Sequence, residues 1–76
     1  MICKTIYKNN LLPADSYDVE CGEHKKTFSR GEEKLVGKWL LSIWEDEIFP
    51  TPAYIYKNIG WDMDHILWCK YELKEG

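Results

Sequence analysis

Residues 29–46 read SRGEEKLVGKWLLSIWED, and this stretch carries the strongest structural signal in the chain. The spacing of Ser29 and Glu32 is that of a capping box, in which both side chains satisfy free amide donors at a helix start. Apolar residues then recur with the period of an α-helix. They are Leu35, Val36, Trp39, Leu40, Ile43 and Trp44. The sequence therefore predicts one amphipathic helix over residues 29–46, with this face packed against a sheet.

Several residues at the end of this helix are not needed for its packing. Leu41 lies off the apolar face and is expected on the outer side, together with Gly37 and Ile48. The acidic run 45–47 follows at the C-terminal end of the helix. Negative charge there interacts unfavourably with the helix dipole, so these acids do not stabilise the helix. These side chains are therefore free to serve a binding function.

The segments before the helix have the composition of β-strands. Residues 2–8 are rich in β-branched and aromatic side chains, which favours a first strand. In residues 17–21 the side chains Tyr17, Val19 and Cys21 alternate with acids, which predicts a half-buried strand. Residues 22–25 suit a turn, and residues 26–28 suit a short antiparallel return strand.

A second hairpin is predicted after the helix. Pro50 and Pro52 exclude helical geometry and indicate a crossover loop. Residues 53–59 have high β-propensity. Residues 66–73 alternate, and the face expected to pack on the core consists of Leu67, Cys69, Tyr71 and Leu73. The predicted fold is α+β: four to five antiparallel strands in the order β-β-β-α-β-β, with one helix on one face.

Length and composition favour a single domain over residues 1–76. A chain of 76 residues has room for one hydrophobic core. Four Trp, five Tyr and two Phe make 14% of the residues aromatic, which is enough large apolar surface for a core without a metal or disulfide.

Charge and cysteine content bear on partners and compartment. The net charge of −3 supplies no long-range attraction for phosphate, which argues against nucleic acids and anionic membranes as partners. No apolar run reaches the roughly 18–20 residues that a membrane span requires. Cys3, Cys21 and Cys69 are odd in number and follow no secretory signal, so three free thiols in a reducing cytoplasm are expected. One disulfide with a leftover thiol is the alternative.

No motif in the chain specifies catalysis or a cofactor. Cys21, His24, His65 and Cys69 are zinc-ligand types, but on a strand His65 and Cys69 lie about 13 Å apart, too far to share one metal. Asp62-x-Asp64-His65 supplies too few ligands for a hard cation. No phosphate-binding glycine motif or nucleophile signature occurs. We therefore expect neither an enzyme nor a metal or cofactor, and a metal- or thiol-dependent protein is an alternative.

The predicted fold leaves several aromatic side chains exposed to solvent. A sheet covered on one side exposes its other face, where Tyr54 and Tyr56 share one side of a strand. The 60–64 loop places Trp61 and Met63 among acids, although Trp61 could instead cap the core. Tyr, Trp and Met are enriched at protein interfaces. The predicted partner-binding residues are Trp61, Met63, Asp62, Asp64, Tyr54, Tyr56, Leu41, Glu45 and Glu47.

These features favour a small, acidic, cytoplasmic protein-binding module that acts as an inhibitor or adaptor on a larger protein. Small single-domain proteins that phages use against host defence systems have this size and lack of motif. Homodimerisation is a further use for the same surface. The main alternative is a binder of single-stranded nucleic acid or nucleotides. It would use Tyr54, Tyr56, Lys57, Lys25, Lys26 and Arg30.

Overall fold

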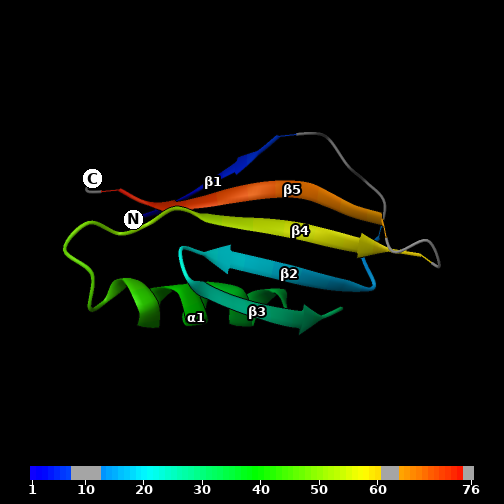
Figure 1. The fold of residues 1–76 in the computed structure, drawn as a ribbon, viewed down its shortest axis with the longest axis horizontal. Helices are drawn as coiled ribbons and strands as arrows, with labels where there is room; N and C mark the ends of the chain where they lie inside the picture. The colour runs from blue at the N-terminus through cyan, green and yellow to red at the C-terminus, as the bar shows by residue number, and fades with distance from the viewer. Residues whose placement is uncertain (8–12, 61–63, 75–76) are drawn as a thin grey trace.

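In the part of the chain that the structure describes, one antiparallel sheet of five strands carries a single helix on one face (Figure 1). The computed structural model describes residues 1–7, 13–60 and 64–74. Its elements are β1 (Ile2–Ile6), β2 (Ser16–Cys21), β3 (His24–Ser29), α1 (Glu33–Trp44), β4 (Ala53–Ile59) and β5 (Asp64–Leu73). Across the sheet the strands run β1-β5-β4-β2-β3. The predicted α+β class and the order β-β-β-α-β-β are confirmed.

The core lies between α1 and the central strands. Val19 on β2 pairs with Ile55 on β4, and Cys21 pairs with Ala53, so these side chains share the face under the helix. The buried apolar residues are Ala14, Tyr17, Val19, Cys21, Phe28, Val36, Leu40, Trp44, Ala53, Ile55 and Cys69. No helix in the described part of the chain has the length and apolar character needed to cross a membrane.

The turn between β2 and β3 is tighter than predicted. Gly22 and Glu23 alone connect the strands, because Cys21 already pairs with His24. Gly22 has a φ of +61°, a left-handed geometry that glycine adopts without steric cost. The return strand therefore spans His24–Ser29, which is longer than the predicted 26–28.

The helix begins at Glu33 and ends at Trp44, so the predicted start at Ser29 and the predicted end at Asp46 are wrong. Ser29 is the last residue of β3. Its backbone N–H donates to Glu32 Oε1 at 2.7 Å, so the glutamate half of the capping box forms, whereas no side chain caps the helix start. Gly31 has a φ of +90°, which is incompatible with a right-handed helix, and this turn delays the helix.

The apolar face of α1 is centred on Val36, Leu40 and Trp44, which are buried. Trp39 and Ile43 pack beside them. Leu35 is 45% exposed, which corrects its predicted place on this face. It lies about 100° around the helix from Val36, so it sits at the margin of the buried face.

A hydrogen bond fixes the start of α1 over β2. The Tyr17 hydroxyl donates to Glu33 Oε1 at 2.8 Å. Burial, and then this hydrogen bond, raise the pKa of Tyr17 to about 12. Tyr17 is therefore neutral and able to donate throughout the physiological pH range.

An irregularity in β5 changes which side chains face the core. Ile55 pairs with Cys69, but Tyr56 pairs with Leu67, so Trp68 is an extra residue on β5. Leu67 therefore lies beside Tyr56 on the face opposite α1, which corrects its predicted core position. Trp68 instead packs against the core, with its ring centroid 5.6 Å from that of Tyr17.

Candidate functional site

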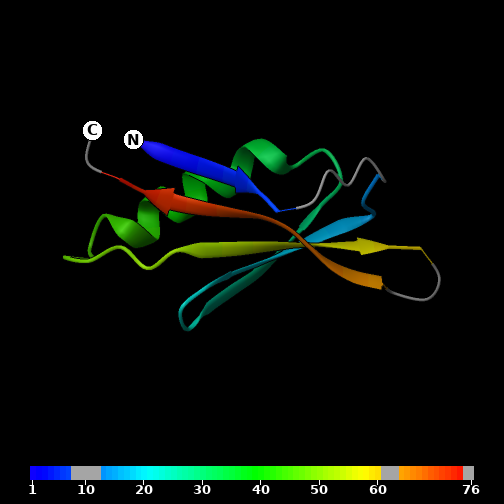
Figure 2. The same cartoon turned by 90° about the horizontal axis from the view of Figure 1, so that it is seen from above.

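One end of the molecule gathers exposed apolar and acidic side chains. The end of α1, the following turn, the end of β5 and the N-terminus meet there (Figures 1 and 2). The backbones of Met1 and Lys74 hydrogen-bond in both directions, at 3.0 and 2.9 Å. We call this surface the apolar-acidic end. It consists of Met1, Leu41, Glu45, Asp46, Glu47, Ile48, Phe49 and Leu73.

Ile48 and Phe49 are its most prominent features. Their exposed fractions are 89% and 88%, the two highest among the exposed large apolar residues in the described part of the chain. Both stand on the turn between α1 and β4, where Pro50 and Pro52 exclude a continuing helix. Two adjacent large apolar side chains are therefore presented almost fully to solvent.

The turn that carries them is held at both ends. Trp44 Nε1 donates to the backbone oxygen of Thr51 at 2.7 Å, and the Cys21 thiol donates to the same oxygen at 3.2 Å. The Thr51 N–H donates to Glu47 Oε2 at 2.9 Å, and the Glu47 N–H donates to the Trp44 oxygen at 3.0 Å. These bonds join residues on either side of Ile48 and Phe49, so the pair is projected by a closed turn.

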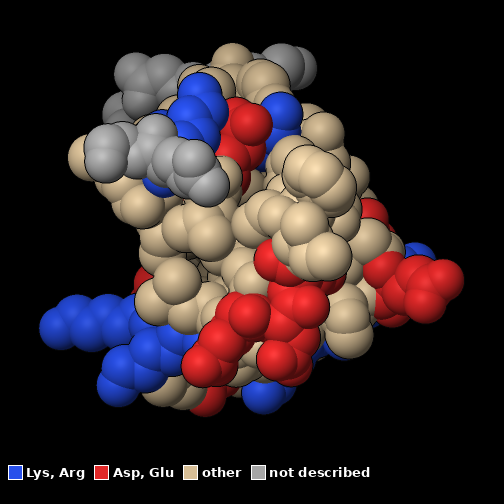
Figure 3. All heavy atoms as spheres, turned by 90° about the vertical axis from the view of Figure 1, so that its left-hand side faces the viewer, with Lys and Arg blue, Asp and Glu red and all other residues tan. Residues whose placement is uncertain are grey.

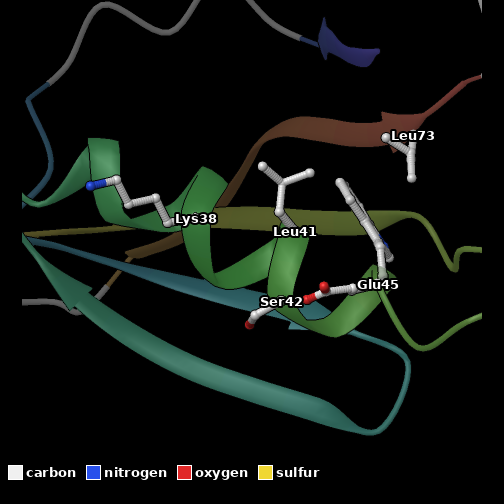
Figure 4. A pocket seen from close by; sticks show the side chains of 6 residues that line it. Lys38, Leu41, Ser42, Glu45 and Leu73 are labelled. Atoms are coloured by element: carbon white, nitrogen blue, oxygen red, sulfur yellow. The ribbon is translucent and has the colours of Figure 1, made fainter.

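Two adjoining hollows lie next to this turn. The first has a volume of about 540 Å³ and is lined by Leu41, Trp44 and Leu73, with Lys38, Ser42 and Glu45 around them (Figure 4). The second has a volume of about 320 Å³ and shares Trp44 and Leu73 with the first. Because they share these residues, the two hollows adjoin, and Trp44 and Leu73 form the apolar surface common to both.

The acidic part of this surface has no counter-charge among the described ion pairs. Those pairs join Lys25 to Glu20, Arg30 to Asp15, His65 to Asp18 and Lys70 to Glu72. Acidic side chains gather on this side of the molecule (Figure 3). Glu45 and Asp46 are both exposed to solvent.

The predicted partner-binding residues are divided between two surfaces. Leu41, Glu45 and Glu47 lie at the apolar-acidic end, and the predicted exposure of Leu41 is confirmed. Tyr54 and Tyr56 lie on the face of the sheet opposite α1, which we call the open face, because Ile55 between them is buried. Trp61, Asp62 and Met63 lie outside the described residues, as does the side chain of Asp64.

The open face carries an ordered polar network. The Tyr56 ring stacks on His65, with centroids 4.3 Å apart and planes inclined by 13°. His65 Nδ1 lies 2.9 Å from Asn58 Oδ1 and 3.5 Å from Asp18 Oδ2. These side chains satisfy one another, which is typical of a solvated sheet surface.

The residues predicted for nucleic-acid binding do not form one surface. Lys57 is only 7% exposed and lies on the helix side of the sheet, away from Tyr54 and Tyr56. Lys26 is also on that side, with its Nζ 5.2 Å from the Phe28 ring centroid. Lys25 shares the open face with the tyrosines but pairs with Glu20 at 3.8 Å. Arg30 Nε donates to the Ala14 oxygen at 3.0 Å.

The residues weighed as metal ligands or nucleophiles are also separated. Cys21 and Cys69 are buried on the helix side, whereas His65 lies on the open face. No group of three metal-ligating side chains occurs among residues 1–7, 13–60 and 64–74. Burial raises the pKa of Cys69 to about 11 and also raises the pKa of Cys21.

We expect the three thiols to differ in reactivity. In folded protein at pH 7.5, iodoacetamide should label Cys3, which is partly exposed, much faster than Cys21 and Cys69. Burial blocks the reagent, and a raised pKa leaves less of the nucleophilic thiolate, which increases only as the pH approaches that pKa. Mass spectrometry of digested protein measures the labelling, and urea-unfolded protein, labelled at all three, is the control. Fast native labelling of Cys69 would contradict its burial.

The partner-binding residues predicted from the sequence do not include Phe49 or Leu73. A signal for Phe49 was present, because two adjacent large apolar residues stand between an acidic run and two prolines. No such local signal exists for Leu73. It reaches this surface only because β5 ends beside α1.

The chain matches no family model, no curated protein and no solved structure. Its function is therefore inferred from the chemistry of these surfaces.

Proposed function

We propose that this protein is a non-enzymatic, cytoplasmic binding module that occupies a surface of a larger protein through the apolar-acidic end, as an inhibitor or adaptor. The observation that carries this proposal is the nearly complete exposure of Ile48 and Phe49 on a turn held at both ends. The fold gains nothing from exposing them, whereas a binding site requires it.

Burial of these two side chains supplies the driving force for binding. Fully burying an Ile or Phe side chain contributes about 1.5–3 kcal/mol relative to exposure. The hydrogen bonds at Thr51 reduce the conformational entropy that the turn loses on binding. The pair can therefore act as anchors, while the adjacent hollows receive apolar side chains of the partner.

The acidic run defines the chemistry of the partner. Glu45 and Asp46 border the anchors and face solvent. A complementary surface has an apolar pocket with Arg or Lys residues at its rim, and the charges increase the association rate and orient the complex. Binding should therefore weaken as the salt concentration rises.

Affinity capture with matched baits tests this proposal. Tagged wild-type protein, the double variant Ile48→Ser/Phe49→Ser and the control Leu35→Ser are incubated with lysate of the native host, and captured proteins are quantified by mass spectrometry. Leu35 is exposed on the same helix but lies in its first turn, far from the apolar-acidic end. We expect one or a few proteins to be captured by the wild type and the control and lost with the double variant.

Two outcomes would contradict the proposal. Equal capture by the double variant, with its fold verified by circular dichroism, would remove the apolar-acidic end as the site. If light scattering shows that the pure protein is a dimer and that the double variant is a monomer, the apolar-acidic end binds a second copy of this chain and not a larger protein.

A further inference from the structure

We infer that the free edge of β1 binds an extended segment of another protein as a sixth strand of the sheet. β1 and β3 are the two edge strands. An edge strand presents unpaired N–H and C=O groups, which is the template for strand addition. This edge adjoins the apolar-acidic end at Ile2, which pairs with Leu73, but it extends away from it to Ile6, and the inference does not depend on the proposed function.

The hydrogen bonds of β1 identify its free groups. Met1 bonds with Lys74, and the Tyr7 N–H donates to the Trp68 oxygen at 3.3 Å, so the odd-numbered residues face β5. In an antiparallel pair, successive residues point their backbone groups in opposite directions. Ile2, Lys4 and Ile6 therefore direct their N–H and C=O groups outward, where no described strand pairs with them.

The other edge is less open. In β3 the outward-facing residues are Lys25, Thr27 and Ser29, because Cys21 and His24 close a two-residue turn. The Ser29 N–H already donates to Glu32 Oε1 at 2.7 Å, and its oxygen accepts from the Glu32 N–H at 3.0 Å. Local hydrogen bonds thus terminate the free edge of β3, while lysine side chains protect the rest.

β1 carries few of the features that block strand addition. Residues 2–6 contain no proline, and their pairing with β5 is continuous. Lys4 is its one charged residue, and its Nζ lies 4.1 Å from the Trp68 ring centroid, so this lysine folds over the helix side of the sheet. Ile6 and Tyr7 beside the edge are exposed apolar residues.

A second copy of this chain is a poor occupant. Two-fold antiparallel pairing of β1 along its full length places Lys4 directly opposite Lys4 of the copy, and like charges at that position are unfavourable. A shift by two residues removes either Ile2 or Ile6 from the ladder. The occupant is therefore a different chain. The residues facing Ile2, Lys4 and Ile6 on the helix side should be apolar, acidic and apolar.

A peptide titration tests this inference. ¹⁵N-labelled protein is titrated with the peptide acetyl-Thr-Val-Thr-Glu-Thr-Val-Thr-amide, which has the expected alternation. We expect saturable shifts and slowed hydrogen exchange at the amides of Ile2, Lys4 and Ile6. The same peptide with Lys in place of Glu should bind several-fold more weakly because it faces Lys4.

Two variants at one position separate backbone pairing from side-chain contacts. Lys4→Pro removes an outward N–H and keeps the bonds to β5, so it should abolish the response. Lys4→Thr keeps the N–H and should retain the response at lower affinity. Protected amides of Cys3 and Thr5 verify that β1 is intact, and Ile6→Pro replaces Lys4→Pro if it is not.

Several results would overturn the inference. They are no response of the wild type across millimolar peptide, a response centred on β3 or on the apolar-acidic end, and an unchanged response of the proline variant. The experiment uses no partner of the apolar-acidic end, so the two proposals succeed or fail separately.

Discussion

Leu40→Ala is expected to lower the free energy of unfolding by about 3 kcal/mol, because it removes a large side chain from a filled core and leaves a cavity. Leu40 is 0% exposed at the centre of the buried face of α1. A domain of this size has a total stability on the order of 4–11 kcal/mol, so the variant should be marginally folded. Urea denaturation followed by tryptophan fluorescence measures the loss.

The adjacent residue supplies the control. Leu41 is 47% exposed, so Leu41→Ala should change stability by less than about 1 kcal/mol. The two substitutions delete the same atoms from neighbouring positions of one helix, which removes helix propensity as an explanation. Similar losses in both variants would mean that α1 does not pack on the sheet through the face centred on Val36, Leu40 and Trp44.

Phe49→Ala is expected to weaken the affinity for the captured partner by about 2 kcal/mol, or roughly 30-fold, without lowering the melting temperature. Phe49 is almost fully exposed, so its removal costs the free protein little. Isothermal titration calorimetry with the purified partner measures the affinity, and Leu35→Ala, which should bind as the wild type does, is the control.

One result would contradict the role of Phe49 as an anchor. If Phe49→Ala binds with wild-type affinity while the unfolding temperature falls, the side chain packs in the fold and is not an anchor. In that case the apolar-acidic end loses its central residue, whatever the affinity measured for substitutions elsewhere.

Local pattern was sufficient for the elements of this fold. Period-2 alternation in β2 and the β-rich composition of residues 53–59 predicted strands that the structure contains. The period of α1 predicted its buried residues Val36, Leu40 and Trp44. The sequence pattern predicts these elements because each of them buries one face, and one-sided burial produces a periodic spacing of apolar residues in the local sequence.

Part of the apolar-acidic end was also predictable as surface that the helix packing does not use. Leu41, Glu45 and Glu47 were singled out because they lie off the packed face of the helix. Tyr54 and Tyr56 were correctly placed together on a strand face, but nothing local indicates that this face lies away from the acidic run. The packing of elements that are distant in sequence decides which surfaces lie side by side.

Tertiary contacts decided the remaining features. The extra residue at Trp68 reverses which side of the sheet Leu67 faces, because the pairing with β4 and not the alternation within β5 sets the register. Gly31 has a positive φ where the chain turns from β3 to α1, and this turn overrides the capping-box signal at Ser29. Leu73 adjoins Trp44 only because β5 ends beside α1.

The sequence by itself determined the α+β class, the element order and the buried face of the helix. Only the tertiary structure decided that Ile48 and Phe49 project together and that β1 has a free edge. The physical reason is the separation in sequence between the residues that interact. Burial patterns act between neighbours in sequence, whereas the Cys21 bond to Thr51 and the order of strands join residues far apart in the chain.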